Sequence, residues 1–145
     1  MARLLVLGFA LTLAACGGGG ESVRSANVQF GDPGDGNLGF TSNNVVIIRD
    51  DLFPHDMIRV LQHELMHVAG QNGHPAEANC IADATINTWP EQPCQSDLEF
   101  MARNLPSQAI RLIVMDPGLW QETLQAATFW NTALNTQAFS VHAGY

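Results

Sequence analysis

The sequence contains no lysine and only one tyrosine, and its six positively charged side chains are all arginine. Fourteen aspartate and glutamate residues outnumber them, which gives the 145-residue chain a formal net charge of −8 at pH 7. Such a chain lacks the basic surface that nucleic acids and anionic lipid head groups require. We therefore expect no nucleic-acid partner, although the charge by itself identifies no substrate.

Long apolar runs are absent after the N-terminal segment, so the rest of the chain predicts no membrane-spanning helix. The remaining chain of about 130 residues is long enough for one domain with a single hydrophobic core. We assign residues 27–145 to this domain and expect it to be a monomer.

Residues 1–15 have the composition of a secretory signal peptide. Arg3 supplies a positive charge, and residues 4–13 form an apolar stretch too short to remain as a membrane-spanning helix. Residues 13–16 read LAAC, which resembles the bacterial lipobox. The resemblance implies cleavage before Cys16 and attachment of diacylglycerol to its sulfur. The alternative is an ordinary secretion signal with an unmodified Cys16.

A flexible tether would join this lipid to the domain. Residues 17–20 are all glycine, and the segment 16–26 as a whole predicts no fold. We therefore expect an exported protein that is anchored to a membrane by its N-terminal lipid. The glycines after Cys16 replace the aspartate that often retains lipoproteins at an inner membrane, so an outer membrane or cell surface is favoured.

Two cysteines remain in the domain, Cys80 and Cys94. Export favours oxidation, so we expect a disulfide that closes this loop and contributes about 3 kcal/mol to stability. Zinc ligation and free thiols remain alternatives, although the pair lacks the C-x-x-C spacing typical of a structural metal site.

The clearest predicted elements are a strand followed directly by a helix. Residues 45–48 are four β-branched residues between turn formers, which predicts a buried strand. Residues 53–70 have apolar side chains at helical spacing, with Asp51 as a plausible N-cap and Pro54 suited to the first turn. The side chains expected to face the core are Ile58, Leu61, Leu65 and Val68.

Other segments are less regular. The glycine- and aspartate-rich residues 27–40 predict turns, because their spacing does not match a calcium-binding loop. Residues 71–97 predict irregular structure with a short helix near 76–86, and residues 98–105 predict another short helix. A second apolar run covers 110–115.

The last predicted element is a C-terminal helix over residues 119–139. Apolar residues recur there at roughly helical intervals. This helix should pack Trp120, Phe129 and Trp130 against the core, although a substrate-binding role for the aromatic rings is the alternative.

Residues 63–67 read HELMH. On a helix His63 and His67 lie one turn apart on the same face, where two imidazoles can bind one Zn²⁺ ion. Glu64 lies beside them and can reach a water molecule on the metal. The alternative is a polar helix face that carries two unrelated histidines.

The longer run over residues 63–74 resembles the signature H-E-x-x-H-x-x-G-x-x-H of the metzincin clan of zinc peptidases. The matching positions are His63, Glu64, His67 and Gly70. The resemblance implies a small zincin-like α+β domain with a mixed sheet, an active-site helix and the C-terminal helix. It also implies that Glu64 is the catalytic base and Zn²⁺ the cofactor.

The third zinc ligand is where the sequence departs from the signature. The family has its third histidine three residues after the glycine, but Gly73 stands there and His74 follows. Because Gly70 and Gly73 both permit positive φ, the loop can accommodate one extra residue, and we assign His74 as the third ligand. The alternatives are Glu77, Asp83, Glu99 and His142. His55 and His142 are otherwise interpreted as surface residues.

A second hallmark of the clan is a methionine-containing turn beneath the imidazoles. Residues 114–117 read VMDP and resemble the matrixin form of this turn, which implies that Met115 supports the site. The tyrosine found near that turn in the family has no counterpart, because the only tyrosine is Tyr145. Oxyanion stabilisation would then come from zinc or from backbone N–H groups.

The resemblance thus implies a lipid-anchored extracytoplasmic zinc endopeptidase that acts on peptides or proteins. Zinc lowers the pKa of its bound water towards about 7, and Glu64 takes the proton. The shifted His74 motivates an alternative, a tethered zinc-binding module or pseudoenzyme without catalysis. A third possibility is an exported structural lipoprotein in which the motif is accidental.

Overall fold

The computed structural model describes residues 24–74, 79–83 and 90–145. In chain order the elements of this part are β1 (Ser25–Phe30), β2 (Gly39–Ser42), β3 (Val45–Ile48), α1 (Pro54–Val68), α2 (Gln95–Asn104), β4 (Ile110–Val114), the 3-10 helix η2 (Pro117–Leu119), α3 (Trp120–Ala133) and β5 (Phe139–Ala143). The expected α+β class is confirmed. None of these helices has both the length and the apolarity needed to cross a membrane.

The strands form one mixed sheet in the order β2-β3-β1-β4-β5, with β1 at its centre. Strands β3, β1, β4 and β5 run parallel, and only the edge strand β2 is antiparallel to its neighbour. The β2–β3 hairpin turns at Asn43 and Asn44, whose φ angles of 48° and 62° are those a two-residue hairpin turn of type I′ requires. The strand predicted over 45–48 is confirmed as β3.

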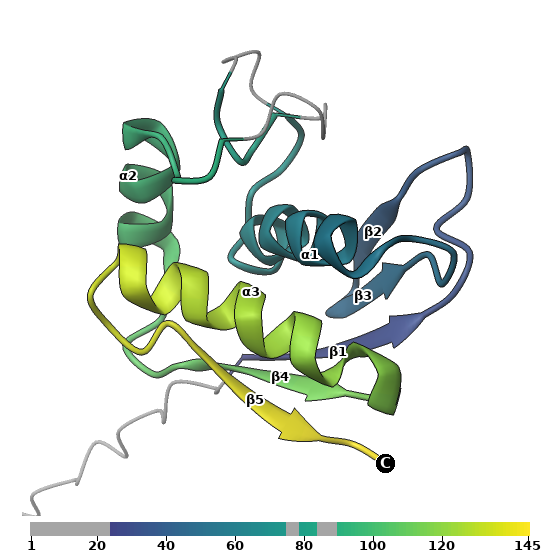
Figure 1. Cartoon of the computed structure of the whole chain (residues 1–145). Helices are drawn as coiled ribbons and strands as arrows, with labels where there is room; N and C mark the ends of the chain where they lie inside the picture. Colours follow the sequence, from purple (N-terminus) through teal and green to yellow (C-terminus); the bar gives the residue numbers. More distant parts are fainter. Residues whose placement is uncertain (1–23, 75–78, 84–89) are drawn as a thin grey trace, which may run out of the picture.

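Helices α1 and α3 cover one face of the sheet (Figure 1). On that face Val28, Val46 and Leu112 are fully buried, whereas Asn27 and Arg111 on the opposite face are exposed. This alternation follows from the two-residue period of a strand. The sheet therefore has one face in the core and one face open.

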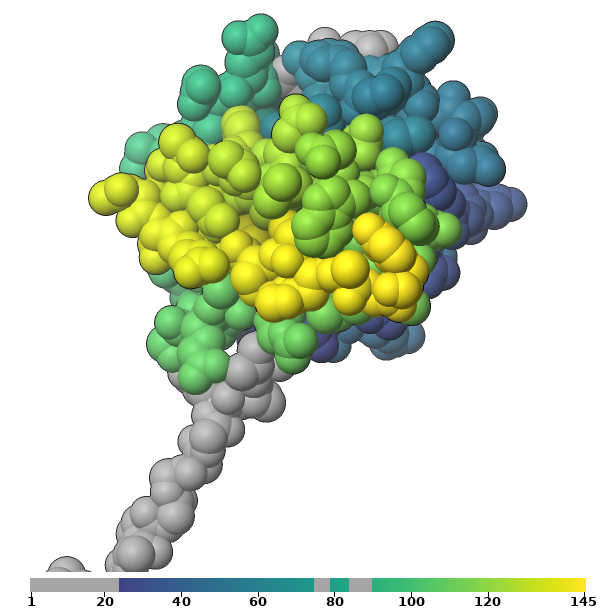
Figure 2. All heavy atoms as spheres, turned by 60° about the horizontal axis from the view of Figure 1, so that its bottom comes forward, coloured from purple at the N-terminus to yellow at the C-terminus, as the bar shows by residue number. Residues whose placement is uncertain are grey.

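Helix α3 is held against α1 by Trp130, whose side chain is completely buried. Its indole Nε1–H donates a hydrogen bond of 2.9 Å to the backbone carbonyl of Gln62 in α1. Trp120 and Phe129 pack against the core while partly exposed, so the predicted packing role of the three aromatics is confirmed. Figure 2 shows the last third of the chain, with α3 and β5, forming a continuous face of the molecule.

Helix α1 begins later than predicted. Its N-cap is Phe53, and no side chain caps it. Asp51, the predicted N-cap, instead accepts a hydrogen bond of 2.8 Å from Nε of Arg49. Because Pro54 begins the helix and has no N–H, one of the donors that a cap would satisfy is absent.

The boundaries at both ends of the domain also differ from the prediction. Strand β1 starts at Ser25, within the segment 16–26 that was expected to have no fold, and residues 27–30 are strand rather than turn. At the other end α3 stops at Ala133 and does not continue to residue 139 as predicted. Strand β5 begins at Phe139. The side-chain amide of Asn131 explains the change, because it both donates to and accepts from the backbone of Phe139, at 2.9 Å each.

The two short helices predicted between these ends have different outcomes. The helix near 98–105 is confirmed as α2, although it begins three residues earlier. The helix predicted near 76–86 lies largely outside the described residues, and residues 79–83 form turns and bends.

Candidate metal centre

Three histidine rings converge at the C-terminal end of α1. His63 and His67 project from α1, and His74 projects from the loop that follows it. Their Nε2 atoms form a small triangle: 3.0 Å from His63 to His74, 3.1 Å from His67 to His63, and 3.2 Å from His67 to His74. The structure thus brings together the three residues that the sequence predicted as ligands.

Backbone carbonyls set the orientation of the two helical rings. Nδ1–H of His63 donates to the carbonyl of Ile81 at 2.6 Å, and Nδ1–H of His67 donates to the carbonyl of Gln71 at 2.8 Å. A ring that carries its proton on Nδ1 has a lone pair on Nε2. The Nε2 lone pairs of both rings are therefore directed to the same point.

Gly70 places the Gln71 carbonyl where it can orient the His67 ring. Its φ of 109° ends α1 in a left-handed turn, with the N–H of Gly70 bonded to the carbonyl of His67 and that of Gln71 bonded to the carbonyl of Met66. This is the Schellman pattern, for which glycine is the preferred residue. The turn reverses the chain and brings the Gln71 carbonyl back onto the His67 ring.

Gly73 completes the return of the loop to the site. Its φ of 75° is again in the left-handed region, immediately before His74. Two left-handed glycines thus accommodate the extra residue by which this loop exceeds the metzincin spacing. The ring of His74 stacks on that of His63 with 4.9 Å between the ring centres.

The surroundings of His63 and His74 favour the neutral forms of these two imidazoles. Burial lowers the pKa of His63 to about 4. His74 is an exposed residue. Its partial desolvation and the charge of His67 nevertheless lower its pKa. Neutral nitrogens with converging lone pairs repel one another unless a cation lies between them. Donor atoms about 2.0–2.1 Å from a tetrahedral metal stand roughly 3.3 Å apart, so the observed triangle fits a metal ion closely.

Glu64 lies between α1 and β2. Its side chain is 4% exposed, and its Oε2 accepts a hydrogen bond of 2.6 Å from Oγ1 of Thr41. Burial raises the pKa of Glu64, while the Thr41 hydroxyl acts in the opposite direction. Gly39 makes this close approach of β2 possible, because a Cβ there would stand 2.4 Å from Val60 and 3.0 Å from Oε1 of Glu64.

An open cleft of about 570 Å³ runs past these groups. One wall is formed by β2 and adjoining residues between 37 and 44, the other by α1 and the loop 71–74, with Glu64, His67 and His74 between them. His67, His74 and Glu64 thus all line the same accessible space.

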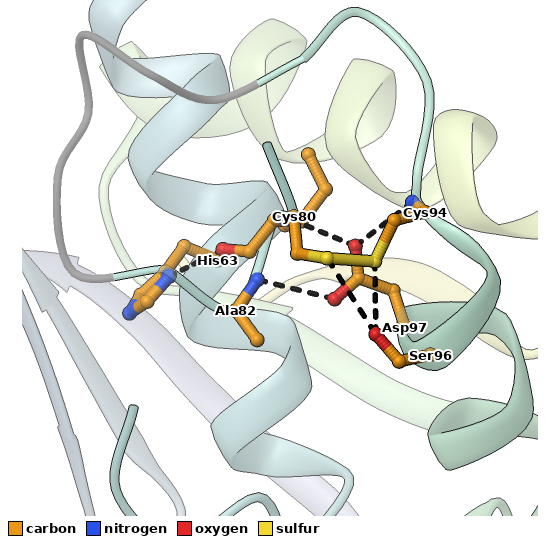
Figure 3. The surroundings of a disulfide bond; sticks show 7 residues. His63, Cys80, Ala82, Cys94, Ser96 and Asp97 are labelled. Atoms are coloured by element: carbon orange, nitrogen blue, oxygen red, sulfur yellow. Dashed lines mark hydrogen bonds between the residues drawn. A yellow bond between two sulfur atoms is a disulfide. The ribbon is translucent and has the colours of Figure 1, made fainter. Parts of the chain in front are cut away.

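The predicted disulfide between Cys80 and Cys94 is present, with Cα atoms 5.1 Å apart. The alternatives of free thiols and of zinc-binding thiolates do not apply to this bonded pair. Figure 3 shows the disulfide and Asp97 beyond the Ile81 carbonyl that accepts from Nδ1 of His63, whereas Nε2 of the same ring belongs to the imidazole triangle.

Met115 does not take the place that the metzincin resemblance implies. It follows β4, at the end of the sheet where α1 begins, whereas the histidines lie towards the other end of α1 (Figure 1). Its side chain is 39% exposed, and its Sδ borders Gly144 near the C-terminus. The exposure and surroundings of Met115 give no support to the Met-turn prediction.

The other candidate ligands lie elsewhere or outside the described residues. Glu99 is exposed on α2 and bonds to Gln95, and His142 lies on β5 beside Ser140. The negative charge of Asp83 acts on the site by opposing the lowering of the pKa of His63 and of His74. The positions of Glu77 and of the predicted lipidation site Cys16 fall outside the described residues.

Sequence analysis missed Thr41 and Asp97. Thr41 lies in a strand that the Asn43–Asn44 pair could have revealed, since two asparagines before a β-branched run are typical of a hairpin turn. Asp97 has a weaker signal, its position in the first turn of α2. The Ile81 carbonyl has none, because every residue carries one.

The chain matches no protein-family model, no curated protein and no solved structure. Its chemistry therefore has to be inferred from the geometry of its own residues.

Proposed function

We propose that this protein is a zinc-dependent endopeptidase whose metal ligands are His63, His67 and His74. The observation that carries the proposal is the convergence of three Nε2 atoms within 3.2 Å of one another, beside a buried glutamate that faces an open cleft. An all-imidazole set of three ligands is typical of catalytic zinc, which keeps a fourth position for water or substrate.

Bound zinc would act as a Lewis acid and lower the pKa of water towards about 7. Glu64 is suited to accept the proton that this chemistry releases, because burial raises its pKa and so strengthens it as a base. The hydroxyl of Thr41 binds Oε2 and thereby orients the carboxylate. The other oxygen, Oε1, is then the atom assigned to carry the proton to the leaving amine.

A polypeptide substrate is favoured by the position of β2. This strand is at the edge of the sheet and also lines the cleft. An edge strand has unpaired backbone N–H and C=O groups, to which an extended peptide can add as a further strand. The resemblance of residues 63–74 to metzincins supports the same substrate class. The position of Met115 adds no support to that resemblance.

Export is part of the proposal. The disulfide between Cys80 and Cys94 fits an oxidising compartment, where such bonds persist. Together with the signal-like N-terminus and Cys16, it supports a protein held at a bacterial membrane by its lipid. The glycines after Cys16 favour an outer membrane or cell surface over an inner membrane.

The test compares the wild-type protein with Glu64→Gln and with Glu99→Gln, a control on the exposed side of α2. Wild type and both variants should bind one zinc ion per chain, measured by metal analysis after dialysis. Hydrolysis of a quenched peptide library should fall by roughly 10²–10⁴-fold in Glu64→Gln only, since a positioned base contributes about that much. Zinc binding without hydrolysis by the wild type would instead identify a non-catalytic metal module, and absence of zinc would refute both.

A further inference from the structure

The carboxylate of Asp97 is buried and holds three backbone N–H groups. Its side chain is 2% exposed, and Oδ2 accepts from Ile81 at 2.7 Å and from Cys94 at 3.1 Å. Oδ1 accepts from Ala82 at 3.2 Å. Only the bond from Cys94 belongs to the capping of α2. The other two bind a separate segment, the one that passes behind His63 (Figure 3).

One peptide group joins Asp97 to the metal site. The N–H of Ala82 and the carbonyl of Ile81 belong to the same peptide unit. Its N–H donates to Asp97, and its carbonyl accepts the Nδ1–H of His63 at 2.6 Å. A carboxylate on the N–H side polarises the peptide and makes its carbonyl a stronger acceptor, which raises the basicity of the His63 Nε2 atom.

The disulfide ties together the two segments that Asp97 bridges. Cys80 immediately precedes Ile81, and Cys94 is the N-cap residue of α2. Cys80 and Ile81 are both fully buried, so the peptide behind His63 is enclosed as well as covalently attached. The bond therefore limits how far this peptide can move away from Asp97 and from His63.

We propose that Asp97 is a positioning residue of the metal centre, acting through the Ile81–Ala82 peptide on His63, and that the Cys80–Cys94 disulfide maintains this connection. Loss of either weakens metal binding although neither touches the metal. This inference rests on the proposed zinc site and adds to it a dependence on the oxidation state of the two cysteines.

The first measurement is zinc affinity, determined by competition with a chromophoric chelator. Asp97→Asn and the double variant Cys80→Ala/Cys94→Ala should each bind zinc about 10- to 100-fold more weakly than the wild type, the usual effect of losing a residue that supports a metal ligand. Glu99→Gln, two residues further along α2 and exposed, should bind like the wild type. Wild-type affinity in both altered proteins would overturn the proposal.

A second measurement separates positioning from general loss of structure. In a His74→Ala background, Asp97→Asn should still weaken zinc binding, because His63 remains a ligand. In a His63→Ala background the same change should have no further effect, because Asp97 acts through His63. An equal loss in both backgrounds would mean that Asp97 supports only the fold.

The metal-free protein provides a readout that does not depend on zinc. Nitrogen-15 spectra of the histidine rings should show His63 with its proton on Nδ1 in the wild type and a mixture of tautomers in Asp97→Asn. If Asp97→Asn does not fold, the double cysteine variant, which keeps the carboxylate, takes its place in this measurement. Its His63 ring should show the same mixture of tautomers. Unchanged tautomers would overturn the inference, whereas a wild type that binds no zinc would refute the proposed function instead.

Discussion

Thr41 and Glu64 are joined by a hydrogen bond of 2.6 Å that links the edge strand β2 to helix α1. The bond matters because Glu64 is 4% exposed, and burial alone would favour its neutral form. Thr41 thus opposes desolvation and keeps the carboxylate available as a base.

Replacing Thr41 with valine should shift the pH dependence of hydrolysis. Without the hydroxyl the pKa of Glu64 rises further, so a higher pH is needed to ionise it. The acidic limb of the kcat/KM profile should therefore move to higher pH while zinc affinity stays unchanged. Thr41→Ser should restore the wild-type limb, and Ser42→Ala in the same strand should leave it in place. An unshifted limb in Thr41→Val would contradict this role.

Gly39→Ala tests the close approach of β2 to α1. The new methyl group would stand 2.4 Å from Cγ1 of Val60 and 3.0 Å from Oε1 of Glu64, so the strand or the helix must shift. Overpacking of this kind costs about 1–3 kcal/mol, which denaturant unfolding can measure. Activity should fall more than zinc affinity, because Glu64 is displaced while the imidazoles are not in contact with Gly39. If Gly39→Ala were as stable as Ser42→Ala, the space between β2 and α1 at this position would have to be large enough for a methyl group.

His74→Ala tests the assignment of the third ligand. Removal of a direct ligand should weaken zinc binding by more than the roughly 100-fold upper range for loss of a supporting residue. His142→Ala and Met115→Ala should leave the affinity unchanged, because His142 is on β5, Met115 follows β4, and neither belongs to the group of converging histidines. A loss in His142→Ala comparable to that in His74→Ala would require a different ligand set.

The stability of the metal-free protein should depend on pH through His63. The pKa of this residue falls from 6.5 in the unfolded chain to about 4 in the folded protein, so the unfolded state binds more protons between these values. Stability is therefore complete above about pH 6.5 and declines by up to roughly 3 kcal/mol as the pH falls to 4.

Glu64 acts in the opposite direction, because a carboxyl whose pKa is raised on folding favours the folded state in acid. The contribution of His63 is isolated by comparing wild type with His63→Ala in urea titrations at several pH values. The variant should lose the decline between pH 6.5 and 4. An identical decline in both proteins would assign it to other groups.

The sequence was sufficient for features that depend on local pattern. The β-branched run 45–48, the periodic segment that forms α1, and the H-E-x-x-H spacing each specify their structure through neighbouring residues. The glycines at 70 and 73 even allowed the third histidine to be assigned despite its shifted position. The cysteine pair followed from the compartment that the N-terminus predicted.

Features that depend on distant contacts were not predictable in the same way. Strand β1 alternates small and polar residues only weakly, and its identity as the central strand depends on pairing with both β3 and β4. Strand β5 was not predicted, because its start is set by the side chain of Asn131 rather than by its own residues. The four-residue resemblance around Met115 carried no information about which end of the sheet this residue would occupy.

The pairing of β1 with β4 has a consequence for how the protein is made. Ser25 is aligned with Arg111, so the two halves of the sheet meet only when the start and the last third of the chain are both available. Contacts of such high sequence separation close late and slow folding. In a growing chain the edge of β1 that pairs with β4 would therefore stay unpaired until synthesis is nearly finished, which makes C-terminal truncation especially damaging.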